Sequence, residues 1–241
     1  QEVSAPNVAA GLFTFTPTPA ANGSPLTSFQ FQVRDDGGTA LGAVDLDQSA
    51  NTLTINITSV NNAPVGTDGS ATTAEDTTLT LAANNFLFTD PGDTPANNLF
   101  RVRIASLPSA GIGVLRNNGV AVAAGDEVTA TAINSGLLTF NPVSNVNGNT
   151  SFTFQVRDDG GTLNGGVDLD QSPNIVSVSV TAVNDDPTAA GDTLTNVVED
   201  SSTRAIAFAT LLANDSAGAN EGTQTLTISN VGGAVGGTVA L

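Results

Sequence analysis

The side chains of this sequence that could do chemistry are mostly carboxylates, and they recur in short turns. One set follows a strand-like segment and consists of Asp158, Asp159, Asp168 and Asp170. A second set has the same spacing and consists of Asp35, Asp36, Asp45 and Asp47. Ca²⁺ takes about six to eight oxygen ligands from carboxylates, amides and backbone carbonyls. Because converging carboxylates repel one another without a cation, each set predicts a Ca²⁺ site within a hairpin.

These acids belong to a sequence segment that occurs twice, far apart in the chain. Residues 154–162 read FQVRDDGGT, as do residues 31–39, and the VDLDQS that follows recurs as well. The offset is constant, since 157 − 34 and 168 − 45 both equal 123. A fixed long period is typical of a repeat array. We therefore predict the C-terminal part of a repeat at 1–62, a complete repeat at 63–186, and the N-terminal part of a further repeat at 187–241.

A second type of Ca²⁺ site is predicted at the junctions between repeats, where oxygen-bearing side chains are concentrated. The junctions themselves supply Asn61, Asn62, Asn184, Asp185 and Asp186. Acidic turns of the following repeat are expected to add Glu75, Asp76, Asp90, Asp93, Glu199 and Asp200. Asp–Gly and Asn–Asp pairs also form turns by bonding to their own backbone. A purely structural role therefore stays an alternative for each single pair.

Short strands must position these turns, because apolar residues alternate with polar ones. Strands are predicted at 28–34, 52–58, 78–82, 101–106, 119–122, 137–141, 151–157 and 175–181. Asn164 and Gly165 tolerate positive φ, which is a hairpin signal. Six phenylalanines are expected in the core, namely Phe15, Phe29, Phe31, Phe140, Phe152 and Phe154. The predicted fold class is all-β, with tandem Greek-key β-sandwich repeats of about 124 residues that are cadherin- or immunoglobulin-like.

Composition excludes several classes of protein. The 241 residues carry 23 acids against six arginines, for a net charge of −17, which disfavours binding to nucleic acid or anionic lipid. Cys, His, Lys, Trp and Tyr are absent, so thiol and imidazole catalysis and an aromatic sugar platform are excluded. Paired glycosidase carboxylates are disfavoured because the same acids recur in each copy. We expect no enzyme, and no apolar run is long enough for a membrane helix.

Four segments of the sequence resemble the cadherin-like tandem repeats of large bacterial surface adhesins. They read AEDTT at 74–78, FTDPGD at 88–93, FQVRDDGG at 154–161 and TAVNDDP at 181–187. The resemblance implies Ca²⁺-stabilised, rod-like extracellular β-sandwiches that serve adhesion, biofilm formation or filament building. Residues 214–221 read NDSAGANE where the pattern has DPGD, which implies an altered site in the third copy.

The partial repeats at the two ends complement each other. Residues 237–241 match 111–115, and Glu2–Val3 match Glu127–Val128, so together they amount to one repeat lacking roughly ten residues. A half sandwich exposes unpaired strand edges, so we expect completion by a head-to-tail homopolymer or by adjacent repeats of a longer chain. Both alternatives predict a Ca²⁺-stabilised adhesin stalk or fibre at the cell surface. A carbohydrate- or protein-binding module is the alternative function, and sequons at Asn56, Asn149 and Asn214 allow glycosylation.

Overall fold

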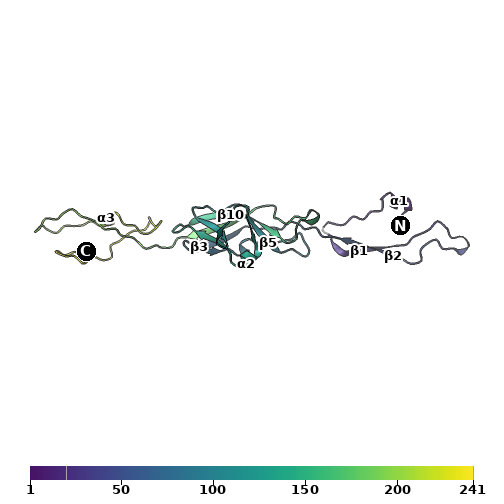
Figure 1. Cartoon of the computed structure of the whole chain (residues 1–241), viewed down its shortest axis with the longest axis horizontal. Coiled ribbons are helices and arrows are strands. Elements are labelled where there is room, and N and C mark those ends of the chain that lie inside the picture. Colours follow the sequence, from purple (N-terminus) through teal and green to yellow (C-terminus); the bar gives the residue numbers. More distant parts are fainter. Residues whose placement is uncertain (20, 241) are drawn as a thin grey trace. The chain divides into compact units, whose positions relative to one another are not determined.

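The computed structural model (Figure 1) describes residues 1–19 and 21–240. The chain divides into two compact units. Leu241, which the sequence aligns with Leu115, lies outside the described residues. The first unit comprises Gln1–Val65, Thr89–Phe100 and Arg157–Gln171. The second unit comprises Gly66–Phe88, Arg101–Val156 and Ser172–Leu241.

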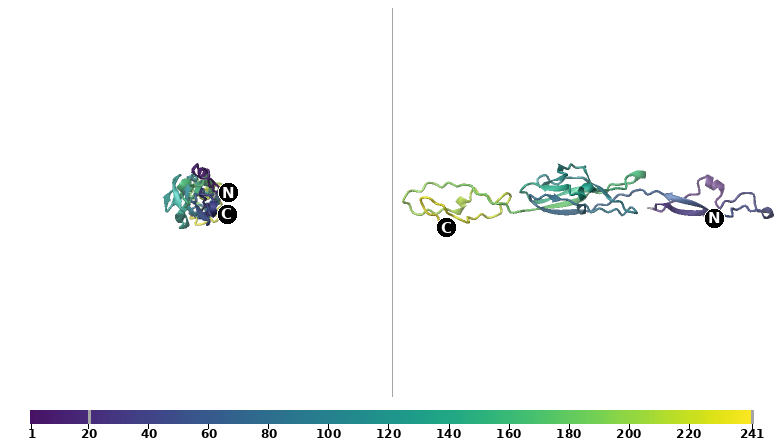
Figure 2. Two further views of the ribbon diagram at one scale, coloured as in Figure 1. Left: turned by 90° about the vertical axis from the view of Figure 1, so that its right-hand side faces the viewer. Right: turned by 60° about the horizontal axis from the view of Figure 1, so that its bottom comes forward.

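The second unit contains two β-sheets, apart from short ends of β5 and β10 that belong to the first unit (Figure 2). The five-stranded sheet has the order β3 (Gly69–Ala74), β11 (Asn174–Thr181), β10 (Gly148–Asp158), β5 (Leu99–Ile104) and β8 (Glu127–Thr129). The four-stranded sheet has the order β4 (Leu79–Thr80), β9 (Leu138–Pro142), β6 (Gly113–Asn117) and β7 (Val120–Ala121). Strand β3 runs parallel to β11, whereas β10 and β11 are antiparallel.

The buried core follows from the alternation of residues along the central strands. In β10 the inward positions are Phe152, Phe154 and Val156, and in β11 they are Val176, Val178 and Val180. Phe86 packs edge-on against Phe154 with ring centroids 5.1 Å apart. Each fully buried side chain of this size contributes roughly 1.5–3 kcal/mol of transfer free energy. The predicted all-β, Ig-like sandwich is confirmed, and so are the predicted core positions in these two strands.

The first unit contains one strand pair, β1 (Gly23–Phe31) and β2 (Asn51–Ile57), after a short helix α1 (Ala5–Ala9). The expectation that Phe15 and Phe31 are core residues is wrong, because they are 47% and 41% exposed. Phe29 is half-buried and makes an edge contact with Phe13 at 5.7 Å. The reason is that no second sheet covers this strand pair within the described part of the first unit.

Residues 187–240 contain no strand in the part that the structure describes. They hold one helical turn, α3 (Phe208–Leu211), and an isolated bridge between Thr188 and Ser216. No helix among the described residues is both long and apolar enough to cross a membrane.

The loop between β10 and β11 corrects the predicted hairpin turn. Asn164 and Gly165 do adopt positive φ, at 57° and 88°. They lie, however, in the 3₁₀ turn η3 (Leu163–Gly165) within a long loop, and an isolated bridge joins Arg157 to Leu169. Strands β10 and β11 therefore pair as expected, but a long loop that carries acidic side chains connects them in place of a tight turn. The sequence does not predict several short elements with weak alternation, namely β3, β6, β8, the helices α1, α2 (Ala130–Asn134) and α3, and the 3₁₀ turns η1 (Ala40–Gly42) and η2 (Ala83–Asn85).

Candidate metal centres

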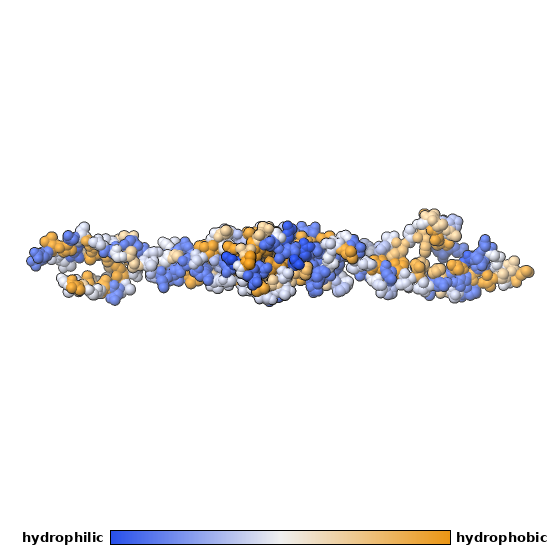
Figure 3. All heavy atoms as spheres, in the orientation of Figure 1, coloured by the Kyte–Doolittle hydropathy of each residue, from blue (hydrophilic) through white to orange (hydrophobic). Residues whose placement is uncertain are grey.

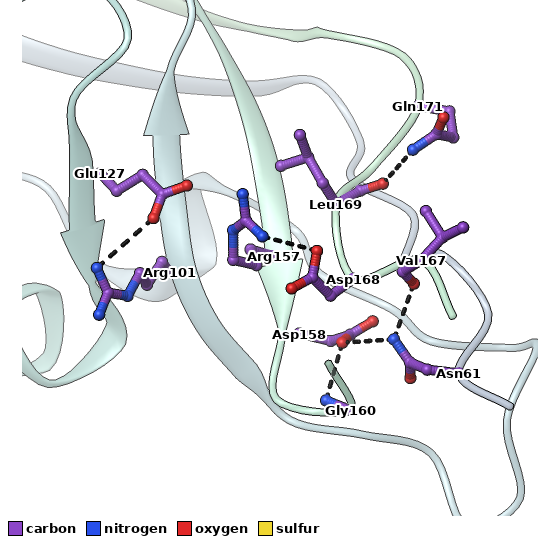
Figure 4. A network of polar contacts seen from close by, with 10 residues as sticks. All are labelled: Asn61, Arg101, Glu127, Arg157, Asp158, Gly160, Val167, Asp168, Leu169 and Gln171. Carbon is purple, nitrogen blue, oxygen red and sulfur yellow. Dashed lines mark hydrogen bonds and ion pairs between the residues drawn. The ribbon is translucent and has the colours of Figure 1, made fainter. Parts of the chain in front are cut away.

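Asp158 is the centre of the first acidic site, which lies in the first unit and consists of Asn61, Asp90, Asn97 and Asp158. Asp158 is the last residue of β10 and is 1% exposed. One carboxylate oxygen, Oδ1, accepts hydrogen bonds from the Asn61 side-chain amide and the Gly160 backbone amide, both at 2.9 Å (Figure 4). The other, Oδ2, is buried and has no hydrogen-bond partner among the described residues.

The electrostatics of Asp158 reflect this incomplete partnering. Burial raises the pKa of the Asp158 carboxyl, and the hydrogen bonds from Gly160 and Asn61 oppose the shift. The negative charges of Asp90 and Asp168 raise the same pKa further. A buried carboxylate with a raised pKa and a free oxygen is a group that a cation would stabilise in its charged form.

Asp90 presents a second free carboxylate oxygen. Its Oδ2 accepts a hydrogen bond from the Asn97 backbone amide at 2.6 Å, while its Oδ1 is buried without a partner in the described chain. The Asn97 side chain in turn donates to the Asn61 side-chain oxygen. Asn61 also donates to the Val167 carbonyl at 2.8 Å. Two buried carboxylates are thus connected through two amide side chains, which supplies several oxygens of the type that Ca²⁺ binds.

The loop that carries Asp90 is held to the first junction by Asp93. The Asn62 backbone amide donates to Asp93 Oδ2 at 2.9 Å, and the Asn62 side chain donates to the Gly92 carbonyl at the same distance. A Cβ atom on Gly92 would lie 2.6 Å from Asn62 Cβ, so this approach requires glycine. Asp159 fastens the far end of the loop, because its Oδ1 accepts from the Asn98 backbone amide at 2.8 Å.

The expectation that four carboxylates converge in the 158–170 hairpin is corrected by the structure. Asp168 forms an ion pair with Arg157 at 2.7 Å (Figure 4). Asp159 accepts a hydrogen bond from Asn98 and does not face Asp158. Asp170 is buried. Over residues 1–19 and 21–240, no three or more acidic side chains form a group arranged to hold a metal. The alternative is an oxygen set in which amides and backbone carbonyls accompany a few carboxylates.

The earlier copy of this hairpin behaves as an ordinary turn. Asp35 accepts from the Gly37 backbone amide at 2.9 Å, and Asp45 lies 3.8 Å from Arg34. Asp47 accepts from the Ser49 backbone amide at 3.0 Å, and this hydrogen bond is the main cause that lowers the pKa of Asp47. Asp36 is exposed. The turn alternative therefore accounts for this copy, and identical sequence serves different roles in the two places.

The second acidic site lies in the second unit and consists of Glu75, Asp185 and Glu221. Glu75 follows β3 and is 4% exposed. Its Oε1 accepts from the Val183 backbone amide at 2.6 Å. Glu75 Oε2, Asp185 Oδ2 and Glu221 Oε2 are all buried without a hydrogen-bond partner among the residues described. This is the same incomplete partnering that marks the first site.

Asp185 and Glu221 meet over one glycine. A Cβ atom on Gly218, whose φ is +135°, would lie 2.5 Å from Glu221 Oε2 and 2.9 Å from Asp185 Cβ. Burial raises the pKa of Asp185, and the charges of Glu221, Glu75, Asp76 and Asp186 raise it further. These carboxylates repel one another across the site, although no three of them are arranged as a ready-made metal group among the described residues.

The predicted grouping of junction acids is only partly reproduced. Glu75 and Asp76 were assigned to the junction before their repeat, but Glu75 binds the backbone just before Asp185, at the junction after it. Asp76 has φ 58° and accepts from the Asn145 backbone amide at 3.0 Å. Asp186, Glu199 and Asp200 lie outside the buried clusters, because all three are exposed.

Sequence reasoning missed Glu221 and Asn97. Glu221 is the last residue of the segment 214–221, which departs from the DPGD pattern. This departure is the only sequence signal that the third copy has a different set of acidic side chains. Asn97 carries no motif, since a single asparagine in an asparagine-rich chain gives no signal.

Comparisons with known proteins bear on the part of the chain that holds the first site. No curated protein and no solved structure matches the chain. Residues 61–170 match the family model described as "Bacterial Ig domain", a range that begins at Asn61 and ends at Asp170. The match supports an Ig-like domain of a bacterial surface protein in this part of the chain, and it does not single out the cadherin-like repeats that the sequence resembles.

Proposed function

We propose that this chain is a structural module of an extracellular bacterial surface protein, built as a stalk or fibre and stabilised by Ca²⁺ at the two acidic sites. The observation that carries the proposal is the set of five buried carboxylate oxygens without hydrogen-bond partners among the described residues. They belong to Glu75, Asp90, Asp158, Asp185 and Glu221. Burying an unpaired charge is costly, so such groups ordinarily coordinate a metal or pair with a cation.

The ligand types favour Ca²⁺ over other metals. The sequence contains no Cys or His, which removes the soft and imidazole ligands that Zn²⁺ and Cu²⁺ prefer. The available atoms are carboxylate, amide and backbone oxygens in loops, which suit the flexible coordination of Ca²⁺ better than the strict octahedron of Mg²⁺. Asp90, Asp158 and Asn61 would hold one ion. Glu75, Asp185 and Glu221 do not form a ready-made three-acid metal group, so the second ion would have to draw these carboxylates together.

Ca²⁺ would act on the fold through charge. Without a cation, the carboxylates of each site repel one another and favour opening of the loops that carry them. A bound Ca²⁺ ion attracts the carboxylates that otherwise repel one another, and it stabilises the folded state by mass action. At the first site it would tie the 89–100 loop to the junction at Asn61, and at the second it would tie the turn after β3 to the junction at Asp185. Stiff junctions are what a stalk or fibre requires.

A carbohydrate-binding role has less support. A surface hollow over β3, β10 and β11 is lined by serine, threonine, asparagine, alanine and valine, without an aromatic ring on which a sugar could stack. Nothing in the lining of this hollow favours a second function.

The test is thermal unfolding of the 241-residue chain in EDTA, in Mg²⁺ and in Ca²⁺. At free Ca²⁺ of about 100 times Kd, one site stabilises by about 2.7 kcal/mol, which corresponds to a rise in Tm of roughly 5–10 °C. Mg²⁺ should give a smaller rise. Equal Tm values in all three buffers would rule out the proposal.

A further inference from the structure

We propose that two loop contacts of this chain are closed by different means: the first junction (residues 61–65 with the loop 89–97) by hydrogen bonds alone, and the second junction (residues 184–188 with the loop 216–224) by a bound cation. This inference rests on the Ca²⁺ binding proposed above and adds that the ion controls one junction and not the other. Hydrophilic residues lie on the surface where the chain leaves β11 and enters the second junction (Figure 3).

The two junctions share one backbone arrangement. The sequence VNNAP at 60–64 recurs as VNDDP 123 positions later. An isolated bridge closes each loop, between Val65 and Thr89 in the first junction and between Thr188 and Ser216 in the second. The two backbone hydrogen bonds of each bridge measure between 2.8 and 2.9 Å. Each loop is therefore attached at an equivalent position of the chain.

A pair of amide side chains also occurs at both junctions. The Asn97 side chain donates a hydrogen bond to the Asn61 side-chain oxygen at the first junction. The Gln224 side chain donates to the Asn184 side-chain oxygen at the second, at 3.0 Å. Asn184 is the sequence equivalent of Asn61 at the offset of 123. The loops thus make the same side-chain contact with the same position.

A glycine of each loop packs against the residue that follows this asparagine. A Cβ atom on Gly92 would lie 2.6 Å from Asn62 Cβ, and a Cβ atom on Gly218 would lie 2.9 Å from Asp185 Cβ. Only glycine allows the two segments to approach so closely. Asn62 and Asp185 therefore occupy the same place in the two junctions, and the junctions differ in the chemistry of these two side chains.

Asn62 closes the first junction without an ion. Its backbone amide donates to Asp93 Oδ2 at 2.9 Å, and its side-chain amide donates to the Gly92 carbonyl at 2.9 Å. Each contact joins a donor to an acceptor, so it needs no further group between them. An ion at Asp90 and Asp158 would add stability to this loop, but the contact between Asn62 and Asp93 forms without it.

Asp185 cannot close the second junction in this way. A carboxylate has no proton to donate, and the loop presents a second carboxylate to it. A Cβ atom on Gly218 would lie 2.5 Å from Glu221 Oε2, on the same glycine that packs against Asp185. Asp185 Oδ2 and Glu221 Oε2 are both buried and have no hydrogen-bond partner among the described residues. Two like charges thus stand where the first junction has a donor and an acceptor.

Glu75 adds a third charge from a fixed position. Its Oε1 accepts from the Val183 backbone amide at 2.6 Å, while its buried Oε2 has no partner in the described chain. The three carboxylates do not form a ready-made metal group. A cation that binds here would therefore have to draw the loop with Glu221 toward Asp185 and Glu75, so that binding and closure of the junction occur together. Without the cation, repulsion favours the open loop.

Amide hydrogen exchange of the full chain compares the two junctions within one molecule. The amides of Val65 and Thr89 report on the first bridge, and those of Thr188 and Ser216 on the second. When EDTA replaces Ca²⁺ at constant pH, exchange at the second bridge should quicken by about tenfold or more, and at the first by less than about threefold. Changes of similar size at both bridges, or a second bridge that stays protected in EDTA, would overturn the inference.

Reciprocal substitutions at the equivalent position sharpen this test. Asp185→Asn gives the second junction the amide of the first, so its bridge should stay protected in EDTA. Asn62→Asp places a carboxylate beside Asp93, so the first bridge should open in EDTA. The control Asp186→Asn removes one exposed charge next to Asp185 and should behave as the wild type. If Asn62→Asp does not fold, Asp185→Asn decides alone, and a second bridge that still opens in EDTA overturns the inference.

Tm measured on the same samples separates this inference from the proposal of Ca²⁺ binding. A wild-type chain whose Tm rises in Ca²⁺ while both bridges respond equally keeps its metal sites and loses the difference between the junctions. A chain whose Tm and exchange rates are both unaffected by Ca²⁺ loses the metal sites, and the cation-dependent closure with them.

Discussion

The Glu75 carboxylate accepts a hydrogen bond from the backbone amide of Val183 at 2.6 Å. This contact fixes the turn after β3 to the junction after β11, across 108 positions of the sequence. Only one of the two Glu75 oxygens is used, and the free one is buried with those of Asp185 and Glu221. The second acidic site is thus assembled from three separate segments of the second unit.

Asp158→Asn should distinguish the destabilising effect of the buried Asp158 charge in the metal-free protein from its contribution to Ca²⁺ binding. The asparagine oxygen can keep the hydrogen bonds from Asn61 and Gly160, while the unpaired charge is removed. We expect Tm in EDTA to stay equal or rise by a few degrees, and the Ca²⁺-dependent rise in Tm to shrink to about half.

Asp35→Asn is the matched control for this change. It alters the equivalent residue of the same sequence motif, which is exposed and caps its own turn. The Ca²⁺-dependent rise should stay at the wild-type value. A large loss in Asp35→Asn, or none in Asp158→Asn, would contradict the assignment of the first site.

Glu75→Gln should remove the second site alone. Glutamine can still accept the hydrogen bond from Val183, so the fold is retained, but the charge that would bind the cation is lost. Calorimetric titration should then detect one Ca²⁺ ion per chain where the wild type binds two. The exposed control Asp192→Asn should keep both, and unchanged stoichiometry in Glu75→Gln would exclude this glutamate as a ligand.

Acidification should have opposite effects with and without Ca²⁺. Burial raises the pKa values of Asp158 and Asp185 above the ordinary carboxyl value of about 3.9. The folded, metal-free protein therefore binds protons more tightly than the unfolded chain. Its stability should rise as pH falls through the raised pKa values toward 4, and it should be lost as pH rises again.

With Ca²⁺ bound, protons compete with the metal for the same carboxylates. Tm in Ca²⁺ should therefore fall over the pH range in which Tm in EDTA rises. Thermal melts between pH 7 and 4.5 in both buffers provide the comparison, and curves that run in parallel would contradict the predicted linkage.

The two sequence copies should differ in how much their phenylalanines stabilise the fold. Phe154→Ala removes a fully buried ring and should cost about 3–5 kcal/mol of unfolding free energy. Phe31→Ala changes the equivalent, half-exposed residue and should cost less than about 1 kcal/mol at concentrations too low for assembly. Urea denaturation of both variants measures the difference, and equal losses would show that the β1–β2 face is already covered in a single chain.

How far the sequence predicts this fold depends on the residue considered. Alternation predicted β10, β11 and the burial of Phe152 and Phe154, because a period of two reflects the pleat itself. It could not predict that Phe31, in the same motif, is exposed, because burial depends on the strands that surround it. The same holds for the acidic residues. Asp158 and Asp35 lie in the same local sequence, but only Asp158 is buried, because Asn61 and Asp90 surround it. Glu221 lies near Asp185 because the chain turns at Gly218, and no sequence motif predicts this turn.

Native mass spectrometry of the full chain, sprayed from Ca²⁺-containing buffer at a concentration that favours monomers, tests the central claim most directly. The account predicts two bound Ca²⁺ ions per chain, with one lost in Asp158→Asn and one in Glu75→Gln. A wild-type chain that carries no Ca²⁺ at free concentrations of several millimolar would contradict it.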